Sequence, residues 1–336
     1  MTLGLGIDTS FDDTAVAIVE DGVHIRSNLT VSQYADHEEF GGVIPERASR
    51  LHIQMMLPLL DEALNEAQVT LDEIDYCAVT NRPGLMGSLL VGVTTAKALA
   101  LARGLPIIGI NHLEAHVHAV HMENPALAFP YVSLLISGAN TIIFHHQSPS
   151  EFHVLGCTLD DAVGECIDKC GRHLGLSMPA GPALQELALQ GDDSIWQLPR
   201  PMLRKPGLSM SFSGLKTAVL YLLRDHPEAR GEDVAASLLS AMTEVLTARV
   251  QKAAREVNVE TLVLCGGAAA NLQIREGFQS MASRNGWKVF WPSIALCTDN
   301  AAMIAGLGHS AFLSGTSAPL DLSVKATVSW KAEGRA

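Results

Sequence analysis

Two histidines four positions apart, His112 and His116, are the residues of this sequence best placed to bind a metal ion. Residues four apart lie one above the other on one helix face, so both imidazoles can reach a single ion. The apolar run at 105–110 predicts a buried strand, which places the pair at the start of the following helix. Solvated and core histidines also occur at this spacing, so the pair by itself is a weak metal motif.

The pair differs from the zinc-protease signature. That signature requires glutamate directly after the first histidine, where it acts as the general base. Here this position is Leu113, and Glu114 points away from the face that carries the histidines. A metal ion bound by this pair would not be arranged for peptide hydrolysis.

Three turns rich in Asp, Thr, Ser and Gly can offer backbone N–H groups and hydroxyls to a phosphate: 8–13, 137–141 and 266–271. None matches the Walker or dinucleotide fingerprint, and each also reads as an ordinary turn. Together they resemble the nucleotide cleft of the actin, Hsp70 and sugar-kinase superfamily. The adjacent carboxylates of Asp12 and Asp13 favour opposite sides of the chain, so we expect at most one to face that cleft. Both also fit as plain turn residues.

The elements that must position these residues form two similar halves. A strand, a small polar hairpin and a second strand are predicted at residues 3–19 and again at 131–144. Alternating helices and strands follow, with helices expected near 44–66, 160–175 and 233–257 and strands near 75–80 and 261–265. We therefore predict an α/β fold of two lobes, 1–125 and 126–336, with a cleft between them.

Composition limits the class of protein. The chain has 336 residues, of which 48% are hydrophobic and 18% charged, and it contains no long uncharged apolar run. The six cysteines lack zinc spacing, which favours reduced core thiols and a cytoplasmic protein. A net charge of −13 argues against a protein that coats nucleic acid by itself. A local basic cluster at Arg200, Arg204, Lys205 and Lys216 remains, with a solvated loop as the alternative.

The sequence resembles one family along nearly its whole length, the TsaD/Gcp/Kae/Qri family of tRNA adenosine threonylcarbamoyltransferases. The matching motifs lie at 6–10, 41–50, 83–85, 112–116, 168–169, 211–217, 266–271 and 297–300. The resemblance implies duplicated ribonuclease-H-like lobes. It also implies transfer of threonylcarbamoyl from threonylcarbamoyl-AMP to N6 of the adenosine 3′ of the anticodon, in tRNAs reading codons that begin with A.

The resemblance also implies the functional residues. His112, His116 and Asp299 match the family's ligands for one divalent metal ion, iron or else zinc, and Asp299 would come from the second lobe. The metal would grip the threonylcarbamoyl group or polarise its carbonyl. Asp12 is the expected catalytic residue, orienting the incoming amine, and Lys216 is a weaker candidate for contact with tRNA. The positions expected to contact the adenylate are Leu135, Ile136, Ser137, Gly138, Ala139, Asp168, Gly181 and Asn271.

The implied partners are tRNA, a TsaB-like subunit and a TsaE-like ATPase. The chain departs from the usual family pattern in having Asp8 for Glu, Phe11 for Cys, and Ala139 and Ala180 for Gly. A left-handed backbone at Ala139 would be strained. Two other functions are considered: a non-catalytic paralogue that serves as a scaffold, and a small-molecule carbamoyltransferase or kinase of the same fold.

Overall fold

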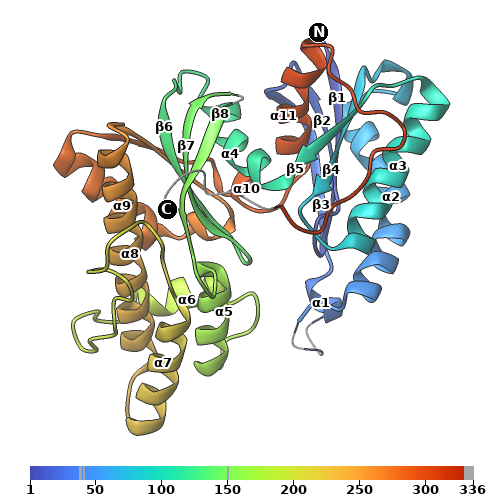
Figure 1. The fold of residues 1–336 in the computed structure, drawn as a ribbon. Coiled ribbons are helices and arrows are strands. Elements are labelled where there is room, and N and C mark those ends of the chain that lie inside the picture. Colours follow the sequence, from blue (N-terminus) through green and yellow to red (C-terminus); the bar gives the residue numbers. More distant parts are fainter. Residues whose placement is uncertain (38–39, 41, 150, 329–336) are drawn as a thin grey trace. The chain divides into compact units, whose positions relative to one another are not determined.

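The computed structural model describes residues 1–37, 40, 42–149 and 151–328 (Figure 1). Gly41, part of one family motif, and residues 329–336 of the predicted second lobe lie outside this range. The described part of the chain divides into two compact units: unit 1 is Met1–Ala126 together with residues 292–328, and unit 2 is Leu127–Trp291. No helix in the described part of the chain is long and apolar enough to cross a membrane.

Unit 1 is built on a five-stranded mixed sheet with the strand order β3-β2-β1-β4-β5. Its strands are β1 (Leu3–Asp8), β2 (Asp13–Glu20), β3 (His24–Ser32), β4 (Tyr76–Arg82) and β5 (Ile107–Asn111). Its helices are α1 (Tyr34–His37), α2 (Pro45–Ala67), α3 (Met86–Arg103), α4 (His112–Glu123), α10 (Ile294–Cys297) and α11 (Ala302–Leu313), with a 3-10 turn at Leu71–Glu73.

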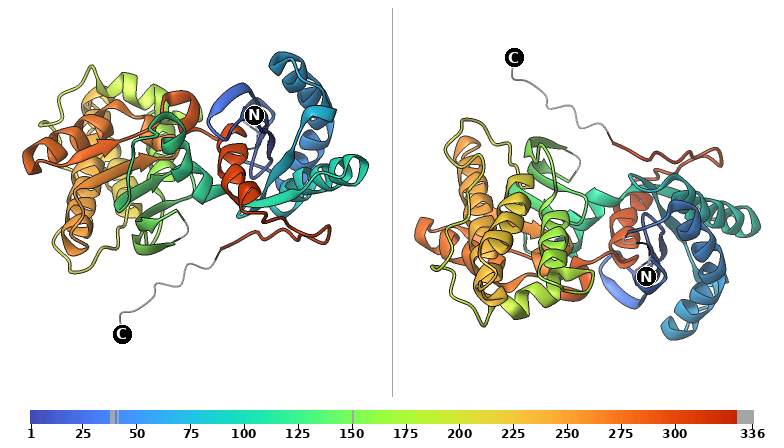
Figure 2. Two further views of the ribbon diagram at one scale, coloured as in Figure 1. Left: turned by 90° about the horizontal axis from the view of Figure 1, so that it is seen from above. Right: turned by 90° about the horizontal axis from the view of Figure 1, so that it is seen from below.

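Side chains alternate between the two faces of this sheet, as the period of a strand requires. On β2, Val16 and Ile18 pack into the core under α2 and α3. Ala15, Ala17 and Val19 join the core on the opposite face, with α4 and α11. Figure 2 shows the two helix layers on either side of the sheet. The small residues on the second face allow α11 to approach closely.

The predicted lobe boundary at the C-terminal end is wrong. The segment from Pro292 belongs to unit 1, although it follows unit 2 in sequence. Gly6 of β1 allows this segment to return to the first sheet, because a Cβ at Gly6 would lie 2.2 Å from the carbonyl oxygen of Ala301. Tyr76 of β4 fixes the same helix by donating a hydrogen bond to the carbonyl oxygen of Ala305, at 2.9 Å. Unit 2 is thus inserted into unit 1.

Unit 2 repeats the topology of unit 1 with the strand order β10-β9-β6-β7-β8. Its strands are β6 (Tyr131–Ile136), β7 (Thr141–Ser148), β8 (Glu151–Cys157), β9 (Thr261–Cys265) and β10 (Lys288–Phe290). Its helices are α5 (Val163–His173), α6 (Ala180–Ala188), α7 (Ser213–Asp225), α8 (Gly231–Glu256) and α9 (Leu272–Asn285), with a 3-10 turn at Gly267–Ala270.

The predicted duplication is confirmed by these pairings. In each sheet the first strand of the unit pairs antiparallel with the second and parallel with the fourth. The predicted helices at 44–66, 160–175 and 233–257 correspond to α2, α5 and α8, with ends that differ by a few residues. The cysteines are free, and all except the exposed Cys157 are buried, so the prediction of core thiols fails at that position.

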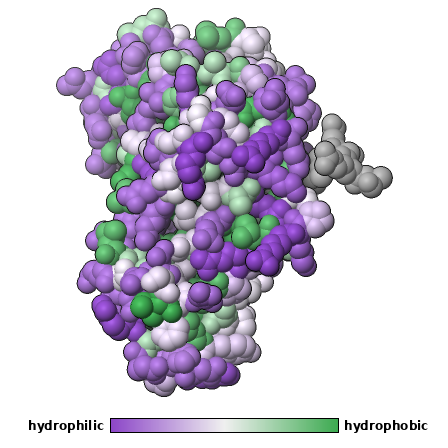
Figure 3. Space-filling model, turned by 90° about the vertical axis from the view of Figure 1, so that its left-hand side faces the viewer, coloured by the Kyte–Doolittle hydropathy of each residue, from purple (hydrophilic) through white to green (hydrophobic). Residues whose placement is uncertain are grey.

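The segment between α6 and α7, which carries Arg200, Arg204 and Lys205 of the basic cluster, is a loop that runs beside α8 (Figure 1). The face of the molecule in Figure 3 is largely hydrophilic with scattered hydrophobic residues. Isolated exposed apolar side chains of this kind are normal on a folded protein.

Candidate metal centre and substrate loops

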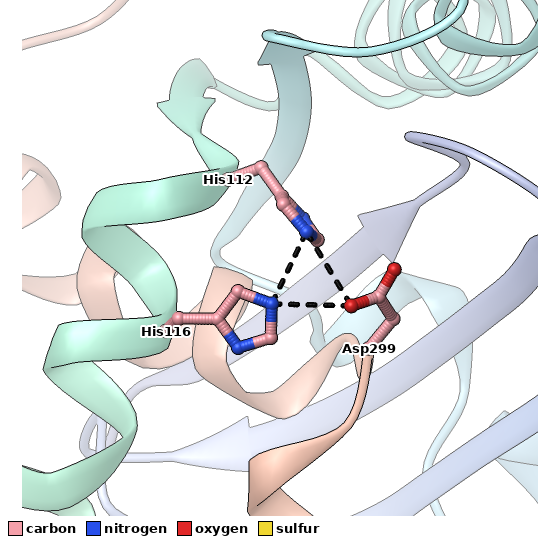
Figure 4. A group of neighbouring side chains, drawn as sticks. All are labelled: His112, His116 and Asp299. Carbon is pink, nitrogen blue, oxygen red and sulfur yellow. Dashed lines mark hydrogen bonds and ion pairs between the residues drawn. The ribbon is translucent and has the colours of Figure 1, made fainter. Parts of the chain in front are cut away.

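His112, His116 and Asp299 converge in unit 1 (Figure 4). The Nε2 atom of His116 lies 3.2 Å from Nε2 of His112 and 3.1 Å from Oδ1 of Asp299. The distance from His112 Nε2 to Asp299 Oδ1 is 3.4 Å. One ligand atom from each of the three residues falls within 4.8 Å of the others, a spacing that suits a single ion at their centre.

The local sequence explains why α4 begins at the first histidine. Asn111 caps the helix: its side-chain oxygen accepts a hydrogen bond from the backbone N–H of Leu113 at 3.0 Å. The amide nitrogen of Asn111 donates to Oε1 of Glu114 at 2.8 Å. Glu114 is therefore held at the cap, which agrees with the prediction that it points away from the face of the histidines. The cap fixes both imidazoles on the first turns of the helix.

Asp299 reaches the histidines from the short connection between α10 and α11. Its neighbour Asn300 is buried and accepts a hydrogen bond from the backbone N–H of Met303 at 3.0 Å, which caps the start of α11. Asn300 also donates to the carbonyl oxygen of Thr298 at 2.9 Å. The expectation that the aspartate comes from the second lobe is wrong, because this connection packs in unit 1.

Asp8 holds His112 from the other side, a role that the local sequence did not predict. Its Oδ2 atom lies 2.8 Å from Nδ1 of His112, and its Oδ1 atom accepts a hydrogen bond from the backbone N–H of Ser10 at 2.9 Å. Asp8 is only 1% exposed, so this pair is screened little by solvent. With the Nδ1 proton bound to Asp8, the Nε2 lone pair of His112 points toward His116 and Asp299.

The electrostatics of the cluster fit a cation. Burial lowers the pKa of His112, but the charges and hydrogen bonds of Asp8 and Asp299 outweigh it and hold the pKa well above its ordinary value. Burial raises the pKa of Asp299, but the charges and hydrogen bonds of His112 and His116 outweigh burial. The pKa of Asp299 therefore lies well below its usual range, and the carboxyl stays ionised. A divalent ion would replace the protons that now balance these buried carboxylates. The residues present therefore fit the metal that the sequence implies.

Asp12 and Asp13 lie at the start of β2, within electrostatic range of Asp299. Burial raises the pKa of Asp12, and the charge of Asp299 raises it further. The same two causes raise the pKa of Asp13 to about 7. Two carboxylates near a third are costly without a compensating cation, which again favours positive charge at this place.

The positions predicted to contact the adenylate gather at one end of the unit 2 sheet. Strands β6 and β9 are parallel neighbours, so the turn after Ile136 and the turn after Cys265 lie at the same end of the sheet. The two turns touch, because a Cβ on Gly266 would lie 2.5 Å from the carbonyl oxygen of Ile136. Leu135 and Ile136 are fully buried, so only their backbone can serve a ligand.

The other predicted positions cap helices at this same end. Asp168 accepts a hydrogen bond from the backbone N–H of Ala180 at 2.9 Å, at the start of α6. Asn271 caps α9 by accepting from the backbone N–H of Ile274 at 3.0 Å. Helix N-termini carry partial positive charge and free N–H groups, which favour phosphate. Gly181, on the first turn of α6, has open space around it, since an added Cβ would meet nothing within 4 Å.

The turn Ser137–Gly138–Ala139 is held by Ser137, whose backbone N–H donates to the carbonyl oxygen of Asn140 at 2.8 Å. Ala139 is not among the residues with a left-handed backbone, so the strain considered at this position does not occur. Its exposed methyl group leaves the turn intact. Lys216 forms an ion pair, with its Nζ 3.1 Å from Oδ2 of Asp161.

Relatives match this chain over nearly its full length. The profile of the TsaD family, described as tRNA N6-adenosine threonylcarbamoyltransferase, matches residues 24–306. Proteins with this same name are 43% identical in Thermotoga neapolitana, over 97% of this chain and 99% of the relative, and 45% identical in Syntrophomonas wolfei, over 96% of each.

Solved structures match the fold at low sequence identity. Component A of (R)-2-hydroxyglutaryl-CoA dehydratase from Acidaminococcus fermentans aligns with a TM-score of 0.57 at 16% identity, covering 93% of this chain and 98% of that one. HypF from T. kodakarensis aligns with a TM-score of 0.63 at 14% identity, covering 94% of this chain and 48% of that one. With the duplicated sheets, these matches confirm the predicted α/β fold of the actin, Hsp70 and sugar-kinase type, while the cleft between the lobes stays a prediction. The extent and identity of the sequence matches show that the chain belongs to the tRNA N6-adenosine threonylcarbamoyltransferase family.

Proposed function

We propose that this protein transfers the threonylcarbamoyl group of threonylcarbamoyl-AMP to N6 of the adenosine 3′ of the anticodon, in tRNAs reading codons that begin with A. The observation that carries the proposal is the intact triad of His112, His116 and Asp299 in a chain that aligns with this family almost end to end. A scaffold paralogue would have no need of a buried ligand set, and neither alternative function accounts for the family match.

We propose one divalent iron or zinc ion as the cofactor, held by His112, His116 and Asp299. When bound there, it would supply Lewis-acid polarisation to a carbonyl oxygen of the threonylcarbamoyl group. Three protein ligands leave coordination positions open, as a catalytic rather than a structural site requires. Asp8 acts as the positioning residue: it fixes the tautomer and the ring orientation of His112.

Asp12 is the proposed catalytic carboxylate. Its raised pKa reflects burial and the nearby charge of Asp299, so its proton affinity is higher than that of a solvated aspartate. Such a carboxylate is suited to orient the incoming N6 amine and to take up the proton that this amine loses on acylation. Its test is a change in the pH profile of kcat on Asp12→Asn, with the metal content unchanged.

The turns of unit 2 are the proposed adenylate site. Backbone N–H groups of 137–139 and the N-terminus of α6 would receive the phosphate, with Asp168 and Asn271 holding the helix starts in place. Gly181 leaves room for the ligand beside α6. The leaving group is AMP, so stabilising the phosphate here favours departure from the carbonyl carbon.

We also propose that the protein works in the cytoplasm with a TsaB-like subunit and a TsaE-like ATPase. The net charge of −13 supports a partner that supplies part of the tRNA-binding surface.

The test is direct. Metal-loaded protein is incubated with threonylcarbamoyl-AMP, unmodified tRNA reading an A-starting codon and the partner subunits, and the digested nucleosides are analysed by mass spectrometry. We expect threonylcarbamoyladenosine from the wild type and none from His116→Ala. Absence of the product from wild-type protein, with metal bound and all partners present, would refute the proposed function.

A further inference from the structure

One stretch of unit 2 has a charge opposite to that of the whole chain. Residues 194–224, here called the basic segment, contain no aspartate or glutamate, whereas the chain as a whole has a net charge of −13. The five cations of the basic segment are Arg200, Arg204, Lys205, Lys216 and Arg224. A concentration of positive charge within an acidic protein indicates a local contact with a polyanion.

Part of the basic segment lines a groove of about 540 Å³, here called the basic groove. Arg200, Arg204 and Lys205 line it, with Glu244 of α8 as its one acidic residue. Glu244 pairs with Arg200 at 2.6 Å. Arg204 and Lys205 are exposed, and no ion pair to either is found among the described residues. Their charges are therefore available to a ligand.

The backbone under the basic groove is fixed from within. Arg249 of α8 is only 2% exposed and donates hydrogen bonds to the carbonyl oxygens of Met202, Lys205 and Gly207. Lys252 adds a hydrogen bond to Gly207 at 3.2 Å. Met202 is held at a φ of 62°, a conformation rare for a side chain of this kind. A buried arginine that binds three carbonyls of one loop gives it a defined shape, which a solvated linker would lack.

A second groove, of about 260 Å³ and here called the aromatic groove, is lined by the two ends of the basic segment and by Asp225 and His226, which follow it. Trp196, Tyr221 and His226 line it. The rings of Trp196 and His226 are 4.9 Å apart, and the Arg224 guanidinium lies 4.6 Å from the centre of the Tyr221 ring. Asp225 also lines this groove and pairs with Arg224 at 2.7 Å, so the charge of Arg224 is balanced. Tyr221 is 50% exposed. The two grooves adjoin, since Nη1 of Arg200 donates to the carbonyl oxygen of Leu198, which lines the aromatic groove, at 2.7 Å.

Unpaired cations in one groove and an exposed aromatic ring in the adjoining groove are a combination that suits single-stranded nucleic acid, with phosphates on the cations and a base on the ring. We propose that the basic and aromatic grooves of unit 2 form an RNA-contact surface, which holds the phosphodiester backbone and an unstacked base of the tRNA substrate. This proposal rests on the proposed function for the identity of the RNA. An acidic protein would also meet the cations, but it would gain nothing from the exposed ring.

The test uses the full-length protein and fluorescently labelled, unmodified tRNA, with binding measured by anisotropy over a range of salt concentrations. The double variant Arg204→Glu/Lys205→Glu is compared with Arg284→Glu/Lys288→Glu, which changes the charge equally at exposed positions of unit 2 outside both grooves. We expect Kd to rise about tenfold or more only in the first variant. We also expect the slope of log K against log salt to fall by about two.

The aromatic groove is tested by Tyr221→Ala, for which we expect about tenfold weaker binding, and by Tyr221→Phe, which keeps the ring and should restore binding. Melting curves confirm that each variant folds. Equal affinity and equal salt slope in both charge variants would overturn the proposal. Failure of the proposed function is distinguishable: wild-type protein would then form no threonylcarbamoyladenosine. If only the RNA-contact proposal is wrong, the wild type stays active and Arg204→Glu/Lys205→Glu has an unchanged KM for tRNA.

Discussion

Asp8 and His112 form a buried pair in which the carboxylate Oδ2 lies 2.8 Å from the imidazole Nδ1. The two residues are separated by 104 positions, and they meet because β1 and β5 lie either side of β4 in the same sheet. The pair determines which nitrogen of His112 is free for a metal. It also places a negative charge behind the ligand, which increases the basicity of the imidazole.

The first prediction concerns this pair. Asp8→Asn removes the charge but preserves the shape, so we expect metal affinity to fall about 10- to 100-fold while the fold is retained. Metal content after dialysis and competition with a chelator measure the change. Asp8→Glu keeps the negative charge and should lose less metal affinity. Asp21→Asn, an exposed aspartate in the same unit, is the control and should bind metal normally. Unchanged affinity in Asp8→Asn would show that the carboxylate does not support the ligand.

The ligands themselves give a second prediction. His116→Ala and Asp299→Ala each remove one of three donors, so we expect loss of stoichiometric metal and of threonylcarbamoyladenosine formation. His121→Ala on the same helix is the control, because His121 lies outside the triad. Elemental analysis and the nucleoside assay are read side by side. A metal-free His116→Ala that stayed fully active would separate catalysis from the metal.

Asp13 gives a prediction about pH. Burial raises its pKa to about 7 from 3.8, so ionisation of Asp13 increasingly opposes folding as the pH rises across that interval. Asp13→Asn removes this cost. We expect it to raise the free energy of unfolding by up to about 4 kcal/mol above pH 7 and to have little effect near pH 4.

The measurement is chemical denaturation of chelator-treated protein at several pH values, because a bound cation near Asp299 would itself lower the pKa of Asp13. The difference between the variant and the wild type should grow up to about pH 7 and then level off. A difference that does not vary with pH would mean that Asp13 does not titrate in this range.

Gly181 tests the proposed adenylate site without disturbing the fold. A side chain there meets no atom within 4 Å, so Gly181→Leu should fold and, as a helical position, should be slightly more stable. If threonylcarbamoyl-AMP binds beside α6, the leucine fills its space, and we expect at least tenfold weaker binding by calorimetry with a non-hydrolysable analogue. Gly214→Leu, on the first turn of α7, is the matched control, since its nearest neighbour would be 3.9 Å away. Equal binding by both variants would exclude this position from the site.

Much of the fold follows from local sequence patterns. The apolar runs and the small polar hairpins between them predicted both sheets, because buried strands and turns are encoded by a few neighbouring residues. The return of Ala301 to the first sheet could not be predicted in this way. Gly4 and Gly6 signal that something approaches β1 closely, but a glycine does not specify which segment fills the space.

The site residues likewise include some that local sequence predicts and others that it does not. The spacing of His112 and His116 is visible in one helix, whereas Asp299 was identified only through the family resemblance. Asp8 appeared in the sequence as a departure from the family pattern, and its contact with His112 depends on strand order. Arg249 gave no local signal either, because its partners are carbonyl groups of a distant loop.

The insertion of unit 2 into unit 1 has a consequence for the order of events during synthesis. The ribosome releases β1 to α4 first, then all of unit 2, and only afterwards the connection that carries Asp299 and the helix α11 that covers one face of the first sheet. A nascent chain that ends before residue 299 has two histidines, an uncovered sheet face and no third ligand. An ion that needs all three ligands could therefore bind only after residue 299 has been synthesised and its connection has packed in unit 1.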